Sequence, residues 1–310
     1  MLAIVCPGQG SQTPGFLAPW LEVPGLADRL AGYAGVTGLD LVAHGTTSDA
    51  DTIRDTAVAQ PLIVAAGLLG LAALTGADGV PAGTGAVAGH SVGEITAAAA
   101  TGVLSETEAL TFVRERGRGM AAASAVTPTG MSAVLGGDPD EVAAALDKHG
   151  LTPANMNGGG QVVAAGTLEQ LAAFAAEPPA KARVIPLQVA GAFHTTHMAP
   201  AVEALDALAA GFTPGAPSVT LLSNADGAAV ADGAQALARL VSQVSNPVRW
   251  DLCTATLADL GVTALIELPP AGTLAGLAKR ALKGVEIVAL KTPDDLDAAR
   301  TLLANHGGTR

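Results

Sequence analysis

Apolar residues in this 310-residue chain gather in short runs that are separated by polar and glycine-containing turns. The run at residues 2–6 predicts a strand, and the longer run at 61–75 predicts a buried helix with Pro61 at its first position. A second strand near 85–90 leads into a helix that is expected to end at about Thr101. Strands and helices that alternate in this way indicate a mostly parallel α/β sheet.

The pattern changes between residues 126 and 193. Strands are expected there at 131–135, 152–155, 161–165 and 183–189, with helices at 139–149 and 168–176. Asp138 and Thr167 are suitable N-cap residues for the two helices. The order βαββαβ is typical of a ferredoxin-like domain. We therefore predict a small inserted domain at 126–193 and a large α/β domain, similar to that of α/β-hydrolases, formed by 1–125 and 194–310.

The alternation of strands and helices returns in the last third of the chain. It predicts strands at 219–223, 264–268 and 285–290 and helices near 234–244, 249–259 and 272–282. A last helix is expected from Thr292 to about Asn305, because Thr292 can act as the N-cap and Pro293 as the first helical residue.

The helix expected after Ser105 carries an arginine on its apolar face. Ser105 and Glu108 form a capping-box pattern at its start. At about 100° per residue, one stripe of this helix contains Ala109, Phe112, Val113, Arg116 and Met120. Arg114 and Arg118 face the opposite side. An arginine such as Arg116 extends toward solvent, pairs with a buried carboxylate or holds an anionic ligand, and the periodicity leaves these alternatives open.

Composition and charge narrow the class of protein. The chain is 49% hydrophobic with a net charge of −12, which argues against nucleic acid or an anionic membrane as the partner. Cys6 and Cys253 form no CxxC pair and no histidines cluster at zinc spacing, so we expect a reducing compartment and no metal. The apolar run at 62–74 is short for a membrane span. A soluble cytoplasmic protein is expected.

The segment Gly89-His90-Ser91-Val92-Gly93 predicts a nucleophile elbow. It follows a short apolar strand and leads into good helix formers, the context in which G-x-S-x-G places a catalytic serine. The tight turn requires glycine on both sides of Ser91. The serine hydroxyl would then lie at a helix N-terminus, where free N–H groups favour an oxyanion.

A serine nucleophile needs a base within hydrogen-bonding distance. His194 follows the last strand of the inserted domain, at a boundary where clefts form, and His197 is its rival because spacing alone does not separate them. His90 is adjacent to the serine, so its side chain is expected to point away from the hydroxyl. Gln9 lies in a glycine-flanked loop after the first strand, from which its N–H could face the site.

Six ordered motifs resemble those of the malonyl-CoA:acyl carrier protein transacylase family and of polyketide-synthase acyltransferase domains. They are Pro7-Gly8-Gln9-Gly10-Ser11-Gln12, Gly89-His90-Ser91-Val92-Gly93-Glu94, Arg116-Gly117, Asn155-x-Asn157 ahead of Gln161-Val162-Val163, Gly191-Ala192-Phe193-His194 and Gln243-x-x-Asn246-Pro247-Val248. The resemblance covers essentially the whole chain. One departure is Pro269-Pro270-Ala271-Gly272, where the family usually has Gly-Pro-Gly.

The resemblance implies a Ser91–His194 dyad in which Gln243 orients the histidine. It also implies an oxyanion hole formed by the N–H groups of Gln9 and Val92. In the reaction that it implies, Ser91 attacks the thioester of malonyl-CoA, and the phosphopantetheine thiol of an acyl carrier protein then takes the malonyl group. Neither a cofactor nor a metal is expected beyond these two substrates.

Substrate-binding residues follow from the same resemblance. Arg116 is expected to bind the free carboxylate of the malonyl group, and Phe193 to crowd an α-methyl substituent. His90 and Asn157 are further predicted substrate-binding residues. The carrier belongs to fatty-acid or polyketide synthesis, and the sequence leaves these two open.

The carrier protein is expected to dock on a local basic patch, since carriers are acidic and this chain is acidic too. Lys279, Arg280 and Lys283 form the predicted patch, and Arg249 could join it. The alternative is that these are solvated residues favoured by the C-terminus of a helix. The competing functions are a serine esterase or thioesterase of the α/β-hydrolase class, an acyltransferase for another acyl group, and an inactive acyltransferase that serves in assembly.

Overall fold

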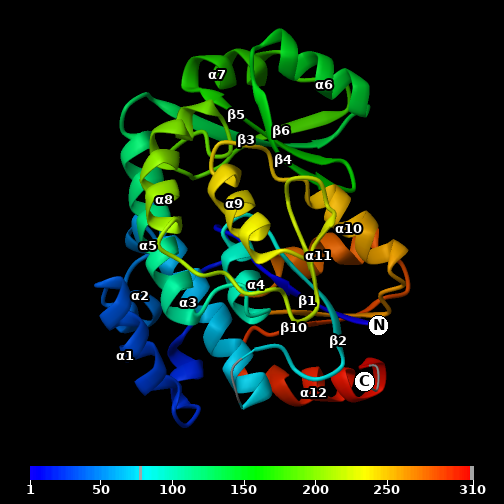
Figure 1. Ribbon diagram of the computed structural model, residues 1–310. Helices are drawn as coiled ribbons and strands as arrows, with labels where there is room; N and C mark the ends of the chain where they lie inside the picture. The colour runs from blue at the N-terminus through cyan, green and yellow to red at the C-terminus, as the bar shows by residue number, and fades with distance from the viewer. Residues whose placement is uncertain (77–78, 308–310) are drawn as a thin grey trace.

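The computed structural model describes residues 1–76 and 79–307 and builds them around two β-sheets (Figure 1). The larger sheet has the strand order β10-β9-β1-β2-β7-β8, in which β8 is antiparallel to β7 and the other pairs are parallel. Its strands are β1 (Leu2–Cys6), β2 (Thr84–Gly89), β7 (Thr220–Leu222), β8 (Ala229–Val230), β9 (Ala264–Glu267) and β10 (Glu286–Ala289). The predicted α/β fold with a mostly parallel sheet is confirmed.

Helices cover both faces of the larger sheet because its strands are apolar on both sides. In β1, Leu2 and Ile4 pack into one core while Ala3 and Val5 pack into another. The first core is covered by α1 (Leu26–Thr37), α3 (Thr56–Thr75), α4 (Gly93–Ala100), α5 (Glu106–Ser124), α8 (Val202–Ala209), α9 (Gly233–Gln243) and α12 (Leu296–His306). The second core is covered by α10 (Trp250–Asp259) and α11 (Thr273–Ala281). The larger sheet thus separates two hydrophobic cores.

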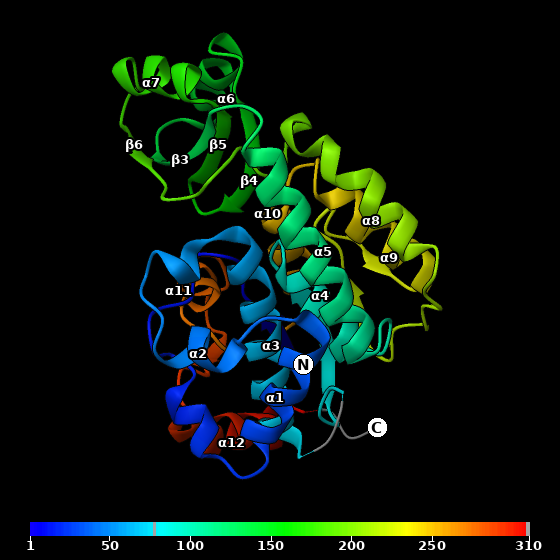
Figure 2. The same cartoon turned by 90° about the vertical axis from the view of Figure 1, so that its left-hand side faces the viewer.

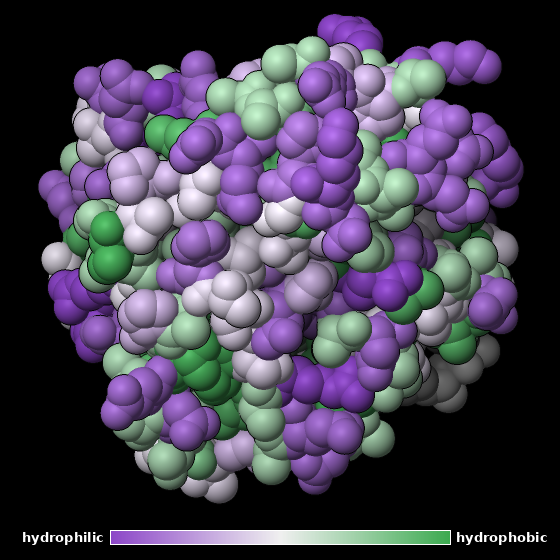
Figure 3. All heavy atoms as spheres, turned by 90° about the horizontal axis from the view of Figure 1, so that it is seen from above, coloured by the Kyte–Doolittle hydropathy of each residue, from purple (hydrophilic) through white to green (hydrophobic). Residues whose placement is uncertain are grey.

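The second, smaller sheet is antiparallel, with the strand order β4-β5-β3-β6. Its strands are β3 (Thr129–Gly136), β4 (Thr152–Gly158), β5 (Gln161–Thr167) and β6 (Ala182–Pro186). Its helices α6 (Pro139–Lys148) and α7 (Leu168–Ala176) lie on the side away from the larger sheet (Figures 1 and 2). Seen from above, that side is mainly hydrophilic, with hydrophobic residues in small separate groups (Figure 3).

The free edge of β4 is joined to the chain that leads into α10. The Met156 N–H donates to the Val248 carbonyl at 2.9 Å, and the Val248 N–H donates to the Ala154 carbonyl at 2.8 Å. The small sheet is therefore held against the larger part of the molecule at its β4 edge (Figure 2).

Helix α3 begins earlier than predicted. The N-cap is Asp55, whose side chain accepts from the Ala57 N–H, so Pro61 lies inside the helix and the prediction that it occupies the first position is wrong. Helix α3 is long and apolar enough to cross a membrane, but 78% of its apolar 18-residue stretch is buried inside the protein. Such burial is typical of a core helix.

The remaining differences from the predicted elements are local. Strand β6 ends at Pro186 rather than at residue 189, and a 3-10 turn at Pro293–Asp295 precedes α12. Three helices and one short strand were not predicted from the sequence: these are α1, α2 (Leu41–Thr46), α8 and β8. Asp138 and Thr167 do cap their helices, as predicted.

Candidate active site

Ser91 stands at the turn between β2 and α4 with a positive φ of 53°. The turn is tight, because a Cβ atom on Gly89 would lie 2.1 Å from the main chain of Gly93, and one on Gly93 would lie 2.1 Å from the Cys6 carbonyl oxygen. Glycine is therefore required at both positions. Since a serine with positive φ is strained by roughly 1–3 kcal/mol, neighbouring contacts must hold it.

Asn224, in the loop after β7, holds this turn from two sides. Its Oδ1 accepts from the Ser91 N–H at 2.8 Å, and its Nδ2 donates to the Gly89 carbonyl at 2.7 Å. Asn224 is fully buried. Sequence reasoning missed it, although it directly follows a predicted parallel strand, and sites commonly form at the carboxyl ends of such strands.

The structure brings Ser91 and His194 together. Ser91 Oγ lies 2.7 Å from His194 Nε2, and His194 Nδ1 lies 2.8 Å from the main-chain oxygen of Gln243. A carbonyl only accepts, so Nδ1 carries the proton and Nε2 is left to accept from the serine. His197 has no such contact with the serine; its N–H donates to Thr195 Oγ1 at 3.2 Å.

Burial keeps the His194 imidazole neutral. Its side chain is enclosed, and burial together with the Arg116 charge lowers the pKa of His194 to about 3. A neutral imidazole beside a serine hydroxyl can accept its proton at any pH near neutrality.

Gln243 contacts the histidine differently from the expected side-chain interaction. Its main-chain oxygen holds His194, while its side-chain Nε2 donates to the Ser91 carbonyl at 3.0 Å and to the Glu94 carboxylate. Its Oε1 accepts from Arg116 Nη2 at 2.7 Å. A sequence pattern identifies a residue type but not which of its atoms makes the contact.

Arg116 is buried, as its place on the apolar stripe of α5 predicts. Its guanidinium donates to two amide oxygens: Nη2 to Gln243 Oε1 and Nη1 to Gln60 Oε1, both at 2.7 Å. Within residues 1–76 and 79–307, no carboxylate lies within 4.0 Å of its guanidinium nitrogens. Burial lowers the pKa of Arg116 to about 10, and it remains a cation at neutral pH.

A cavity of about 80 Å³ lies in front of Ser91 and His194. Besides Ser91 and His194, four of the predicted site residues line it, namely Gln9, His90, Val92 and Phe193. Gln60 also lines it, and Gln60 Oε1 accepts from the buried Arg116, which lies behind Gln60 and not on the cavity wall. Sequence reasoning missed Gln60, whose signal is a polar residue at the start of the apolar run before Pro61.

The main-chain N–H groups of Gln9 and Val92 are available to a ligand. Val92 is the N-cap of α4, outside the hydrogen bonds of that helix. In the part of the chain that the structure describes, neither N–H has an acceptor. Two N–H groups beside a nucleophilic serine can stabilise an oxyanion.

Two further cavities adjoin the first, of about 370 Å³ and about 250 Å³. Gln9 and Leu187 line all three. Asn157 lines the smaller of the two, and its Oδ1 lies 2.9 Å from His90 Nε2. These contacts join the end of β4 to the elbow.

The predicted basic patch lies at the end of α11, where Lys279, Arg280 and Lys283 are exposed. Arg280 lines the cavity of about 250 Å³ and donates to Gln161 Oε1 at 3.3 Å. Arg249 instead forms a two-bond contact with Asp251 at 3.0 and 2.9 Å, so its charge is already paired.

The comparisons with known proteins agree on one family. The model of the acyl transferase domain family matches residues 3–306. The malonyl CoA-acyl carrier protein transacylase of Mycobacterium tuberculosis is 53% identical over 308 residues, which cover 97% of this chain and 100% of that protein. The crystal structure of the transacylase from Mycobacterium tuberculosis has a TM-score of 0.91 at 53% identity, covering 97% of this chain and 99% of that one.

A second solved structure is a type II PKS acyl-carrier protein in complex with its malonyl-transacylase. Its matching chain has a TM-score of 0.89 at 30% identity and covers 97% of this chain and 99% of that one. The match of the family model over nearly the full length, together with these relatives, identifies the chain as a member of the acyl transferase domain family.

Proposed function

We propose that this chain transfers a malonyl group from malonyl-CoA to the phosphopantetheine thiol of an acyl carrier protein, through a malonyl ester on Ser91. The observation that carries the proposal is that the Ser91–His194 pair lines one small cavity and that Gln60, on the wall of the same cavity, is hydrogen-bonded to the buried Arg116 cation. A hydrolase needs the first feature but has no use for a buried cation that lacks a carboxylate partner. The names of the relatives favour transfer over hydrolysis.

In the first half-reaction, Ser91 Oγ attacks the thioester carbonyl while its proton passes to His194 Nε2. The carbonyl oxygen becomes an oxyanion, to which the N–H groups of Gln9 and Val92 donate in this proposal, each such donor being typically worth about 10²–10³ in rate. The carbon–sulfur bond then breaks, and the CoA sulfur leaves with the proton from His194. The product is a malonyl ester of Ser91.

In the second half-reaction, His194 takes the proton of the pantetheine thiol as its sulfur attacks the ester. The carbon–oxygen bond breaks, and Ser91 recovers its proton from His194. The Gln243 carbonyl keeps Nδ1–H in place in both half-reactions, so the imidazole can change between acceptor and donor at Nε2 without turning.

Arg116 holds the free carboxylate of the malonyl group in this proposal. In the structure Gln60 Oε1 occupies one guanidinium N–H and lines the cavity, so a substrate carboxylate can take its place as acceptor. A planar guanidinium suits a carboxylate, because two parallel hydrogen bonds form. Phe193 and Val92 restrict the space around the α-carbon, which favours malonyl over methylmalonyl.

Asn155 provides a contact for the pantetheine arm. It lines both the cavity at Ser91 and the neighbouring one of about 250 Å³. Its Oδ1 is buried and has no hydrogen-bond partner in the described part of the chain. An amide N–H of pantetheine can donate to it, and the carrier would reach this opening from the patch formed by Lys279, Arg280 and Lys283.

The division of the chain is part of the proposal. Residues 126–193 would form a ferredoxin-like domain, supported by the βαββαβ order and a separate hydrophobic cluster around Phe174. Residues 1–125 and 194–310 would form an α/β-hydrolase-like domain. No cofactor other than the two substrates is needed, and we assign the protein to the cytoplasm.

The proposal is tested by measuring the intact mass of the protein after mixing with malonyl-CoA in the absence of a carrier. We expect a stable increase by one malonyl group, which is lost in Ser91→Ala. Release of CoA and malonate without any adduct would contradict the proposal and favour a hydrolase. Mixing with acetyl-CoA and methylmalonyl-CoA distinguishes an acyltransferase for another acyl group.

A further inference from the structure

Glu94 is a buried carboxylate that no step of the proposed reaction uses. It is the second residue of α4, and it is not one of the residues that line the cavity at Ser91. Its Oε1 accepts from the Asn224 N–H at 2.7 Å, and its Oε2 accepts from Gln243 Nε2. Only 5% of the residue is exposed, so these contacts are shielded from solvent.

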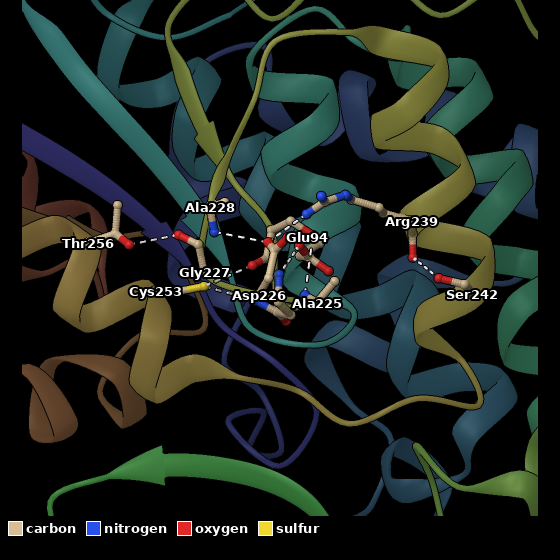
Figure 4. A network of polar contacts seen from close by, with 11 residues as sticks. Glu94, Ala225, Asp226, Gly227, Ala228, Arg239, Ser242, Cys253 and Thr256 are labelled. Carbon is tan, nitrogen blue, oxygen red and sulfur yellow. Dashed lines mark hydrogen bonds and ion pairs between the residues drawn. The ribbon is translucent and has the colours of Figure 1, made fainter.

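Figure 4 shows Glu94 in the middle of a polar network between α9 and the loop that contains Ala225 and Asp226. The Arg239 side chain extends along this network but pairs with Asp226, at 2.6 Å. Among residues 1–76 and 79–307 no ion pair joins Glu94 to a cation, and the Gln243 amide lies between Glu94 and the Arg116 guanidinium.

The Gln243 side-chain amide links Glu94 to Arg116, and the two neighbours allow it only one orientation. An arginine only donates hydrogen bonds and a carboxylate only accepts them. The amide can satisfy both neighbours in one orientation alone, with Nε2 toward Glu94 and Oε1 toward Arg116. The opposite orientation would place Nε2 against the guanidinium and Oε1 against the carboxylate.

From this geometry we propose that Glu94 is a positioning residue for recognition of a carboxylated acyl group. It fixes the orientation of the Gln243 amide, and through that amide it holds Arg116 at the position from which it binds the malonyl carboxylate. The inference rests on the proposed function. Its consequence is selective: losing the Glu94 carboxylate impairs reactions of malonyl groups more than reactions of acyl groups without a carboxylate.

The same carboxylate also supports the elbow, through the Asn224 N–H. A purely structural role would therefore slow acylation of Ser91 by any acyl-CoA. The test must separate a selective effect from a general one, so it compares malonyl-CoA with acetyl-CoA in each variant.

The variant of choice is Glu94→Gln, which keeps the shape but offers one acceptor oxygen to two donors. If that oxygen serves the Asn224 N–H, the Gln243 amide must turn and present Nε2 to Arg116. We expect kcat/KM for malonyl-CoA to fall about 10- to 100-fold, the range expected for loss of a charge-assisted hydrogen bond, while that for acetyl-CoA changes less than about threefold. Glu106→Gln, which removes a carboxylate paired with Arg29 outside the site, is the matched control and should leave both rates unchanged.

The decisive measurement is the effect of Glu94→Gln on the malonyl-to-acetyl ratio of kcat/KM when Arg116 is also replaced. In an Arg116→Ala background, Glu94→Gln should cause no further change in the malonyl-to-acetyl ratio. An equal loss with both acyl groups, or the same fall in the ratio in the Arg116→Ala background, would overturn the inference. If Glu94→Gln does not fold, Gln243→Met replaces it, and an unchanged ratio in that variant would overturn the inference as well.

Ester formation by the parent protein shows whether a failed test overturns the proposed function or only this inference. A parent that forms no malonyl ester overturns the proposed function and this inference with it. A parent that forms the ester, with a Glu94→Gln variant that keeps the parental malonyl-to-acetyl ratio, overturns the inference alone.

Discussion

At the scale of single residues, the site depends on three buried ionisable groups whose pKa values burial shifts in different directions. Burial lowers the pKa of His194 to about 3 and that of Arg116 to about 10. It raises the pKa of Glu94 to about 7, against hydrogen bonds from Asn224 and Gln243 and the charge of Arg116. At neutral pH, the histidine is thus ready to accept a proton and the arginine is ready to bind an anion.

The raised pKa of Glu94 predicts how stability depends on pH. Between about pH 4.5 and 7 the folded protein keeps the Glu94 proton while the unfolded chain releases it, so this residue stabilises the fold at low pH and the effect is lost as the pH rises through 7. Glu94→Gln has no such proton. We expect its free energy of unfolding, relative to that of the parent, to increase between pH 4 and pH 8 by on the order of 3 kcal/mol.

Urea unfolding of both proteins at a series of pH values measures this difference. His194 destabilises the fold as the pH falls below about 6.5, because its depressed pKa leaves the proton to the unfolded chain, but this effect is common to both proteins and cancels. Two curves that stay parallel from pH 4 to pH 8 would show that the pKa of Glu94 is not raised.

Residue types in the site could be predicted from sequence better than their contacts. Ser91 and Arg116 follow from local patterns, the first from flanking glycines and the second from helical periodicity. The Gln243 main-chain contact and the Asn224 clamp could not be predicted, since they depend on how distant segments meet. His194 was not separable from His197 by spacing, and only the fold places one of them 2.7 Å from the serine.

At the scale of elements, the strand–turn–helix unit β2–α4 is the part on which the chemistry most depends. The first turn of α4 lies directly over the end of β1, so this unit tolerates no added atom at either glycine. Elements with strong periodicity or a clear cap were predicted within a few residues, as for α7 and β1. Helices α1 and α8 were not predicted, and neither begins with a side-chain N-cap hydrogen bond of the kind that marks the start of α7.

The elbow yields a prediction with an internal control. In Gly89→Ala, the new Cβ would lie 2.1 Å from the main chain of α4, so we expect a loss of at least about 3 kcal/mol in the free energy of unfolding and no malonyl adduct. Gly32→Ala, in α1 with no atom within 4 Å of the added Cβ, should gain up to about 1 kcal/mol and acylate normally. Chemical unfolding and intact mass measure both, and a fully stable, active Gly89→Ala would contradict the tight-turn geometry.

At the scale of the whole molecule, the catalytic cavity lies between the two sheets. Ser91 and Gln9 come from the larger sheet and its loops, whereas Met131 and Val163 line the cavity from the smaller one. The sequence order of strands and helices predicted a mostly parallel sheet and a second set of strands, although the larger sheet joins distant parts of the chain, with β1 between β9 and β2 and with β2 beside β7. The contact between the sheets could not be predicted, as it rests on single bonds such as those of Val248 with β4.

The position of the basic patch predicts how the carrier is recognised. Because opposite charges raise the rate of association, Lys279→Glu combined with Lys283→Glu should raise the KM for the carrier about 10-fold at low salt, with a much smaller effect at high salt. Formation of the malonyl adduct from malonyl-CoA should stay within about twofold. Arg118→Glu, an exposed charge reversal on α5, is the control, and an equal change in that variant would place the docking surface elsewhere.

The central claim is that Ser91 passes its acyl group to a thiol rather than to water. It is tested most directly by forming the malonyl adduct, removing excess malonyl-CoA and adding the phosphopantetheine form of an acyl carrier protein, with both proteins followed by intact mass. The account predicts that the adduct persists in buffer and that, once the carrier is added, it disappears in step with a malonyl group appearing on the carrier. An adduct that decays to free malonate at the same rate with and without the carrier would contradict it.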